Sequence, residues 1–253
     1  MKQLLSTGDP EPVEWINKES ASPILLLCEH AGQAIPKALG NMGISPQSLQ
    51  SHIGWDIGAE ALARGIADRL SAPLILQRYS RWGIDCNRPP HRRSAIPNIS
   101  DGTVIPKNSA LTEADRLARV RSIFDPLEQA IRDGFATQPR RAAFSIHSFT
   151  PQLSDGQHRQ WNAGFLARAD DQTSQMMMNY IASRMPRLVL GHNEPYQLDD
   201  ASDWFIPAHA EARDMAHSLI EIRNDLITDE QGQKNWAQRL APLLSSSITS
   251  ASA

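Results

Sequence analysis

Short, continuous apolar runs alternate along this chain with segments of helical pattern. The runs occupy residues 23–28, 73–79, 142–148, 187–191 and 217–223, with a further strand expected within 161–169. The helical segments are 57–70, 112–135, 172–185 and 233–248. A strand buried on both faces reads as an unbroken apolar run. The alternation therefore predicts a mixed, largely parallel sheet with helices on both faces, a three-layer α/β/α fold.

The bulk properties of the chain exclude several classes of protein. Its 253 residues, 41% of them apolar, can bury a sizeable core, and we predict one domain over residues 1–253. The net charge of −3 comes from interspersed residues, so no nucleic-acid partner is expected. No apolar run reaches the ~18 residues of a membrane span, and the first residues resemble no signal peptide. Cys28 and Cys86 form no CxxC pair, so reduced, buried thiols in a cytoplasmic protein are expected.

Local sequence signals predict where two helices begin, and they indicate one long loop. Asp56 precedes the first helical segment and is placed near its N-cap. Thr112 and Asp115 resemble a capping box at the start of the second, and Pro126 is expected to bend or split that helix. Residues 80–111 lack a clear period, and so long a loop is usually functional or mobile.

Polar side chains follow the predicted strands where each one ends. Glu29 and His30 follow the first run, the segment 80-SRWGIDCNRPP-90 follows the second, and His147 ends the third in 144-FSIHSF-149. The segment 191-GHNEPY-196 follows a later strand. Ligands bind beyond the carboxyl ends of strands in open α/β sheets. Glu221, between two isoleucines, would be costly if buried and unpaired, so it either pairs with an arginine or faces a site.

Two histidines and a carboxylate from separate elements fit a catalytic zinc ion. Zinc favours three protein ligands and an open position for water, whose pKa it lowers. His30 and His147 are the expected imidazole ligands. The carboxylate is either Asp56 or Glu29, and neighbouring residues of an extended chain point opposite ways, which argues against Glu29 beside His30. The alternative role of Asp56 is a plain helix N-cap.

Four segments resemble the N-formylglutamate amidohydrolase family, within the clan of zinc carboxypeptidases and aspartoacylase-like deacylases. They are 29-EHAGQAIP-36, 80-SRWGIDCNRPP-90, 145-SIHSF-149 and 221-EIRNDL-226, with further matches at 193-NEPY-196 and His209. The chain departs from the pattern in the first turn, where Glu29 and Ala31 replace the expected proline and serine. Gln33 stands where carboxypeptidases carry the glutamate of HxxE, so the resemblance moves the carboxylate ligand to Asp56.

The resemblance implies a phosphorylase/hydrolase-like fold of the zinc carboxypeptidase kind. It also implies roles for particular residues. It implies hydrolysis of the amide of an N-acyl, here N-formyl, amino acid, with one zinc and Glu221 as general base. Substrate would be held by Arg81, Asn87, Arg88, Asn193, Tyr196 and His209. Asp85 and Glu29 would contact the ligand histidines from outside the metal site.

The residues independently favour a substrate with a carboxylate. Arg81 and Arg88 lie in one polar loop, and a guanidinium binds a carboxylate through two parallel hydrogen bonds. Their alternative role is an ion pair with Asp85 or Glu221. The other five histidines, His52, His91, His158, His192 and His217, are interpreted as surface or structural residues.

Two rival functions stay open at this stage. One is a different enzyme of the clan, either a carboxypeptidase or a deacylase of another N-acyl amino acid. The other is a non-catalytic protein that binds carboxylates on the same fold. Glu221 argues against the second, because a binding protein has no need of a base. The sequence predicts no oligomeric state.

Overall fold

The structure, a computed structural model, describes residues 3–250 and the side chains of residues 3–248. Its centre is a seven-stranded sheet with the strand order β1-β3-β2-β6-β9-β7-β8. The strands are β1 (Val13–Ile16), β2 (Ile24–Cys28), β3 (Leu74–Gln77), β6 (Ala142–Phe149), β7 (Ala163–Leu166), β8 (Leu190–His192) and β9 (Ala216–Arg223). Each predicted apolar run therefore overlaps a strand, although β8 starts three residues later than predicted, and β1 is a strand that the patterns did not predict.

The four central strands of the sheet run parallel. β2 pairs with β3 and β6, and β6 pairs with β9, all in the parallel sense. β1 and β7 are antiparallel to their neighbours β3 and β9, whereas β7 and β8 are parallel. This confirms the predicted mixed, mostly parallel sheet. It also brings the carboxyl ends of β3, β2, β6 and β9 to one edge.

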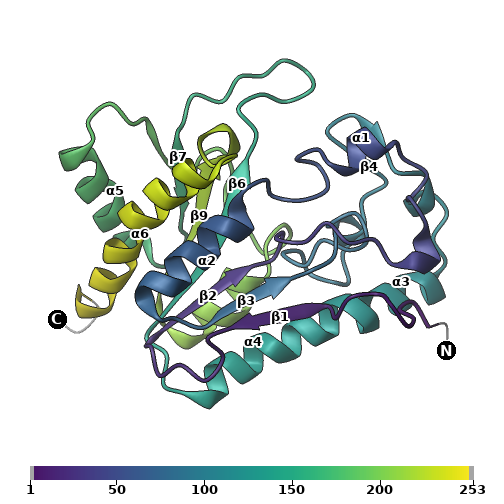
Figure 1. The fold of residues 1–253 in the computed structure, drawn as a ribbon, viewed down its shortest axis with the longest axis horizontal. Coiled ribbons are helices and arrows are strands. Elements are labelled where there is room, and N and C mark those ends of the chain that lie inside the picture. The colour runs from purple at the N-terminus through teal and green to yellow at the C-terminus, as the bar shows by residue number, and fades with distance from the viewer. Residues whose placement is uncertain (1–2, 251–253) are drawn as a thin grey trace.

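Helices cover both faces of the sheet, as the alternation predicted. α2 (Ala59–Leu70), α5 (Asp171–Arg184) and α6 (Glu230–Ser250) pack on one face. α3 (Glu113–Arg119) and α4 (Asp125–Thr137) lie on the other. Figure 1 shows α2 and α6 crossing in front of the strands while α4 runs beside β1. None of the helices formed by the described residues is both long and apolar enough to span a membrane.

The residues of β9 divide between the two hydrophobic layers. Ile220 and Ile222 are fully buried against the α2, α5 and α6 side. Leu219 packs into the opposite layer, and side chains alternate along a strand, so Glu221 faces the same way as Leu219. Burying one such aliphatic side chain contributes roughly 1.5–3 kcal/mol. Packing of the isoleucines thus fixes the direction in which Glu221 points.

The start of α2 differs from the sequence prediction. The N-cap is Gly58, not Asp56, and it has a positive φ of 80°. A Cβ at position 58 would lie 2.2 Å from the backbone oxygen of Ile227, so only glycine fits there. The helix consequently begins at Ala59, and the Asp56 side chain is not used as a helix cap.

The long second helix is capped and split as predicted. The Thr112 hydroxyl accepts a hydrogen bond from the Asp115 N–H, and Asp115 bonds back to the Thr112 N–H, which completes the capping box. Residues Val120–Phe124 form a π-helical turn between α3 and α4, in which the Asp125 N–H bonds to the Val120 carbonyl. Pro126 has no N–H to donate and stands in the first turn of α4.

The segment 80–111 has no long element but is fixed by buried contacts. It contains a two-stranded hairpin of β4 (Ile99–Ser100) and β5 (Thr103–Val104). The sequence patterns predict neither this hairpin nor the short helix α1 (Pro46–Leu49), which lies earlier in the chain. The fully buried Arg119 guanidinium donates to the Asn108 side chain at 2.6 Å and to the Gly83 carbonyl at 2.8 Å. Cys28 and Cys86 are free, buried thiols, as predicted.

Candidate metal centre and its cavity

A cavity of about 470 Å³ lies at the edge of the sheet where the central parallel strands end. Its lining includes residues that follow β2, β3 and β6, together with Glu221 of β9. His147 and Glu221 stand side by side in register on β6 and β9. The strand order therefore brings together side chains that are far apart in the sequence, at the place where open α/β sheets bind ligands.

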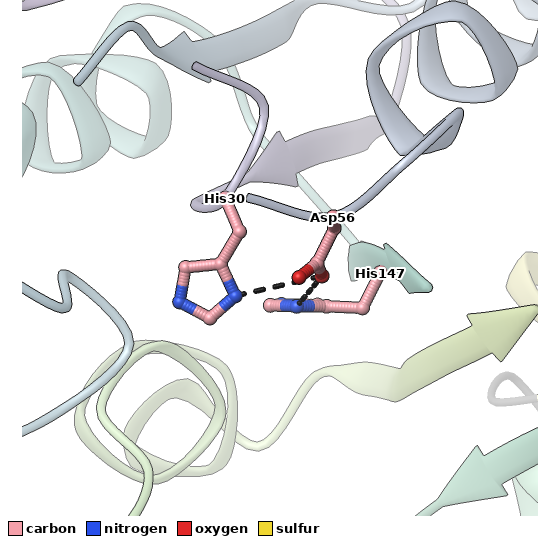
Figure 2. A group of neighbouring side chains, drawn as sticks. All are labelled: His30, Asp56 and His147. Atoms are coloured by element: carbon pink, nitrogen blue, oxygen red, sulfur yellow. Dashed lines mark hydrogen bonds and ion pairs between the residues drawn. The ribbon is translucent and has the colours of Figure 1, made fainter. Parts of the chain in front are cut away.

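His30, Asp56 and His147 form a buried group that can hold a metal ion. One ligand atom from each lies within 4.8 Å of the others. The Nδ1 atom of His147 lies 2.8 Å from Oδ2 of Asp56, and the Nδ1 atom of His30 lies 3.5 Å from the same oxygen. Figure 2 shows both rings beside the Asp56 carboxylate. Ligands of a tetrahedral zinc lie roughly 3.3 Å apart, given metal–ligand bonds of ~2.0–2.2 Å.

The second nitrogen of each histidine ring is held by a different carboxylate. Nε2 of His30 lies 2.7 Å from Oδ1 of Asp85, and Nε2 of His147 lies 3.0 Å from Oε2 of Glu29. Histidines that ligate metals are commonly oriented in this way. Glu29 lies on the outer side of the His147 ring and is not among the residues that line the cavity, so Asp56 is the carboxylate that reaches the shared centre.

One buried nitrogen of this group has no hydrogen-bond partner in the described structure. Nδ1 of His30 is enclosed and makes no hydrogen bond, the Asp56 oxygen being 3.5 Å away, although the ring is fixed through Nε2. Such an atom is costly to bury unless something accepts its lone pair or its proton. Two imidazole nitrogens and a carboxylate oxygen are donors that zinc accepts, so the residues fit a divalent ion of this kind.

Neighbouring charges shift the pKa values of His147 and of Asp85, the carboxylate that contacts His30. Burial lowers the pKa of His147, but the Glu29 and Asp56 carboxylates outweigh it and hold that pKa well above its usual value. Burial raises the pKa of Asp85, but Arg81 and His30 outweigh it and keep the carboxylate ionised well below the usual pKa. A metal must displace protons from the imidazoles, so metal binding at this centre is expected to weaken at acid pH.

Glu221 faces the cavity and makes no ion pair with the residues that the structure describes. It is 6% exposed, and its Oε2 atom has no hydrogen-bond partner among the described residues. Arg223, on the same side of β9, pairs instead with Asp225 at 2.8 Å. Burial raises the pKa of Glu221 to about 7, opposed by the charge of His147 and assisted by that of Asp56. The carboxylate can therefore exchange a proton near neutral pH.

The three polar residues expected from the segment 80–90 all line the cavity. Arg81 bonds Asp85 at 2.7 Å and approaches Asp56 at 3.4 Å. Arg88 also contacts Asp85, at 3.2 Å. Asn87 donates to Asp203 through its amide and accepts from the Trp204 N–H. Both arginines thus make the ion pair with Asp85 that is their alternative role, and both also line the cavity, where a ligand can reach them.

Of the other three residues predicted to contact substrate, one lines the cavity and two do not. Tyr196 lines the cavity, whereas Asn193 and His209 do not. The Asn193 side chain accepts from the Ala167 N–H and supports a turn with a positive φ of 54°. His209 bonds Glu128 at 2.8 Å on the α4 side of the sheet. The prediction that these two residues contact substrate is therefore not supported by their positions, because the fold uses both side chains elsewhere.

The cavity also includes residues that the sequence does not assign to a site. His52, interpreted as a surface or structural residue, lines the cavity and bonds Asp101 at 3.2 Å. Arg159 lies in the segment after β6 and also lines the cavity. The available signal for Arg159 was its position beyond the carboxyl end of a parallel strand. No local pattern distinguishes it from a solvated arginine.

The contact between His209 and Glu128 yields a prediction about acid stability. Burial raises the pKa of Glu128, but hydrogen bonds from His209, Trp204 and Arg132 outweigh it and lower that pKa to about 2. Because the folded-state pKa lies below the unfolded value, the stabilisation is present above pH ~4.5 and is lost as pH falls toward ~2. Glu128→Gln should lower the free energy of unfolding by about 1–2 kcal/mol at pH 6, allowing for partial solvent screening.

Urea unfolding of wild type and Glu128→Gln at pH 6 and pH 3 checks this prediction. The difference between the two proteins should shrink at pH 3. The matched control is Glu19→Gln, in an exposed turn, which should stay within ~0.5 kcal/mol of wild type. A Glu128→Gln difference that is equal at both pH values would show that the contact contributes no charge-dependent stability.

Comparisons with known proteins identify a family and two proteins of similar structure. The family model described as N-formylglutamate amidohydrolase matches residues 22–228, most of the chain. The structure is similar to that of the gene product Atu2144 from Agrobacterium tumefaciens, with a TM-score of 0.91 and 32% identity over 99% of this chain and 100% of that one. It also shares its fold with N-formylglutamate amidohydrolase from Ralstonia eutropha JMP134, with a TM-score of 0.64 and 17% identity over 96% of this chain and 98% of that one.

Comparison with curated proteins finds no match. The matched region begins just before β2 and ends just after β9, so it contains His30, Asp56, His147 and Glu221 together with the arginines of the cavity. The family assignment and the geometry of the cavity thus concern the same part of the molecule, and the chain belongs to the N-formylglutamate amidohydrolase family.

Proposed function

We propose that this chain is a metal-dependent amidohydrolase that cleaves N-formylglutamate, with water, into formate and glutamate. The observation that carries the proposal is the meeting of His30, Asp56 and His147 in one cavity with the unpartnered carboxylate of Glu221. The family to which the chain belongs is that of an amidohydrolase acting on this substrate.

The metal would be held by Nδ1 of His30, Nδ1 of His147 and a carboxylate oxygen of Asp56. The buried Nδ1 of His30, which makes no hydrogen bond, supports this assignment, as does the anchoring of both rings through Asp85 and Glu29. We propose zinc, because two imidazoles and one carboxylate with room for water are its usual catalytic ligands. A divalent ion bound there supplies polarisation of the amide carbonyl and a lowered pKa for a bound water.

Glu221 is the proposed general base. It stands in register beside His147 and faces the cavity, within the same group of charges. A base whose pKa lies near the working pH is partly ionised at that pH and still binds a proton strongly enough to remove it from water. Glu221 would accept a proton from the attacking water and return one to the amide nitrogen as the C–N bond breaks. Its lack of an arginine partner supports this role over that of a structural ion pair.

Arg81, Arg88 and Asn87 are proposed to bind the carboxylate next to the scissile amide. Arg81 approaches Asp56 at 3.4 Å, so its guanidinium lies beside the proposed metal centre. Asp85 fixes both arginines while it orients His30. One aspartate therefore links the metal ligand to the substrate-binding arginines, and this positions the amide carbonyl relative to Glu221. Tyr196 is a further proposed contact with the substrate.

A substrate panel separates this function from its rivals. Purified protein should release product from N-formyl-L-glutamate at least ~10-fold faster than from N-acetyl-L-glutamate, since one additional methyl group in a fitted pocket costs about 1–3 kcal/mol. A peptide ending in glutamate should be a poorer substrate still. Preference for the acetyl compound or the peptide would favour another enzyme of the clan. Binding of N-formyl-L-glutamate without release of formate would favour a non-catalytic carboxylate-binding protein.

A further inference from the structure

Three arginines line the cavity, but they differ in their ionic partners. Arg81 pairs with Asp85 and approaches Asp56, and Arg88 shares Asp85. Arg159 has no carboxylate within 4.0 Å among the residues that the structure describes. It is nonetheless 7% exposed, and a guanidinium so enclosed is costly to bury without an anion.

The Arg159 side chain is held in place by aromatic residues and by its own backbone. Its Nη1 atom donates to the Tyr196 hydroxyl at 2.8 Å, and its Cζ atom lies 4.8 Å from the centroid of the Tyr196 ring. The Phe149 ring lies at 5.9 Å. The Arg159 N–H donates to the Pro151 carbonyl at 2.8 Å. The guanidinium is therefore preorganised, which lowers the entropic cost of binding a ligand.

Most of the hydrogen-bonding capacity of Arg159 is unused. A guanidinium has five N–H donors, and the described protein accepts from only one of its nitrogens, Nη1. Because the side chain lines the cavity, the free donors of Nε and Nη2 are available to a ligand there. Two parallel N–H groups match the two oxygens of a carboxylate.

The positions of the arginines assign them different carboxylates. In an N-acyl amino acid, the α-carboxylate lies close to the scissile amide and so must bind near the metal centre, where Arg81 contacts Asp56. The side-chain carboxylate of a glutamate derivative lies farther away by two methylene groups. Arg159 makes no ion pair with Asp56 or Asp85 and stands on the wall formed with Tyr196 and Phe149.

We infer that Arg159 binds the side-chain carboxylate of the substrate and thereby selects N-acyl amino acids with an acidic side chain. This inference rests on the proposed amidohydrolase function and adds a residue that determines specificity. It gives a role to a buried arginine that, among the described residues, has no acidic partner, beside two arginines that have one.

Paired substrates test the inference. Wild type should hydrolyse N-formyl-L-glutamate with a kcat/KM about 10- to 100-fold above that for N-formyl-L-glutamine, the amide of the same shape. Arg159→Met should remove most of that preference, lowering kcat/KM for the glutamate compound by about the same factor while changing the glutamine compound little. Arg88→Met should instead lower both. Arg168 pairs with Asp200 and Glu211 outside the cavity, so the control variant Arg168→Met should change kcat/KM for neither compound.

A purely structural Arg159 would give a different result, with both substrates affected equally or not at all, and this would overturn the inference. If Arg159→Met does not fold, Arg159→Lys keeps the charge but loses the planar fork, and should still reduce the glutamate-to-glutamine ratio several-fold. Calorimetric binding of both compounds to metal-loaded Glu221→Gln protein gives the same ratio without turnover. Absence of hydrolysis by wild type would refute the proposed function, whereas equal binding of the two compounds would refute the role of Arg159.

Discussion

Replacing Glu221 with glutamine is expected to lower the rate of N-formylglutamate hydrolysis by about 10²–10⁴-fold, the usual contribution of a general base. Glutamine keeps the shape of the side chain but cannot accept the proton of the attacking water. The carboxylate lines the cavity beside His147, and its Oε2 atom has no partner within the described residues. No contact of the fold should therefore compensate for the lost base.

The same substitution is expected to leave the fold and the metal content near those of wild type. Glu221 is not part of the His30–Asp56–His147 group, and its neighbours Ile220 and Ile222 keep their packing. Arg223 has its own partner in Asp225, so no buried guanidinium is left unpaired. Removal of a buried, unpartnered carboxylate relieves a desolvation cost, and the melting temperature should be unchanged or slightly higher.

Melting temperature, metal stoichiometry and formate release measured on Glu221→Gln decide between a base and a structural carboxylate. The control is Glu230→Gln, at the exposed start of α6, for which all three quantities should match wild type. Near-normal turnover per folded Glu221→Gln molecule would contradict the catalytic assignment. A loss of metal together with activity would instead indicate that Glu221 supports the metal site.

Replacing His147 with alanine is expected to abolish tight metal binding and, with it, hydrolysis. Loss of a carboxylate that only orients a ligand typically costs 10–100-fold in metal affinity, and loss of the ligand itself should cost more. The imidazole also separates two buried carboxylates, with Asp56 at one nitrogen and Glu29 at the other. Its removal takes away the partner that these two carboxylates share, so the metal-free variant should be less stable than metal-free wild type.

Matched variants identify which contacts belong to the metal centre. His209→Ala removes another buried histidine, outside the cavity, and should keep the metal content of wild type. Asp56→Ala should lose the metal, whereas Glu29→Ala should lower its affinity only by the smaller factor of an orienting residue. Full metal content in His147→Ala would show that its assignment as a ligand is wrong. Retention in Asp56→Ala with loss in Glu29→Ala would make Glu29 the third ligand.

The sequence predicted the strands of the site well because they are buried on both faces. The continuous apolar runs of β2, β6 and β9 are typical of buried parallel strands. Because parallel strands end at the same edge of a sheet, the side chains at their carboxyl ends lie together. His30, His147 and Glu221 were found in this way. The short edge strand β1 and the hairpin of β4 and β5 lack such continuous runs, and their formation depends on tertiary contacts.

Residues outside the strands were harder to place. Asp56 has the position of a helix N-cap in sequence, and only the close approach of Gly58 to Ile227 shows why the helix starts later. His209 lies in a short π-helical turn, Ile206–Ala210, and Arg159 lies in a loop, and nothing in the local pattern of either reveals its partner. For His209 that partner is Glu128, 81 positions earlier in the chain, whereas Arg159 packs against Phe149 and Tyr196 from two other segments. Contacts of this kind are set by the whole fold.

Formate release during metal titration tests most directly whether the His30–Asp56–His147 centre drives hydrolysis. Protein stripped with a chelator would receive zinc in increments, with N-formyl-L-glutamate in excess. We expect no formate before metal is added, a linear rise in rate, and a plateau at about one zinc per chain, as a single three-ligand site requires. The His147→Ala protein should show no rise over the same range. Full activity in the stripped protein, or no formate from N-formyl-L-glutamate at any loading of zinc or other divalent metal, would contradict the account.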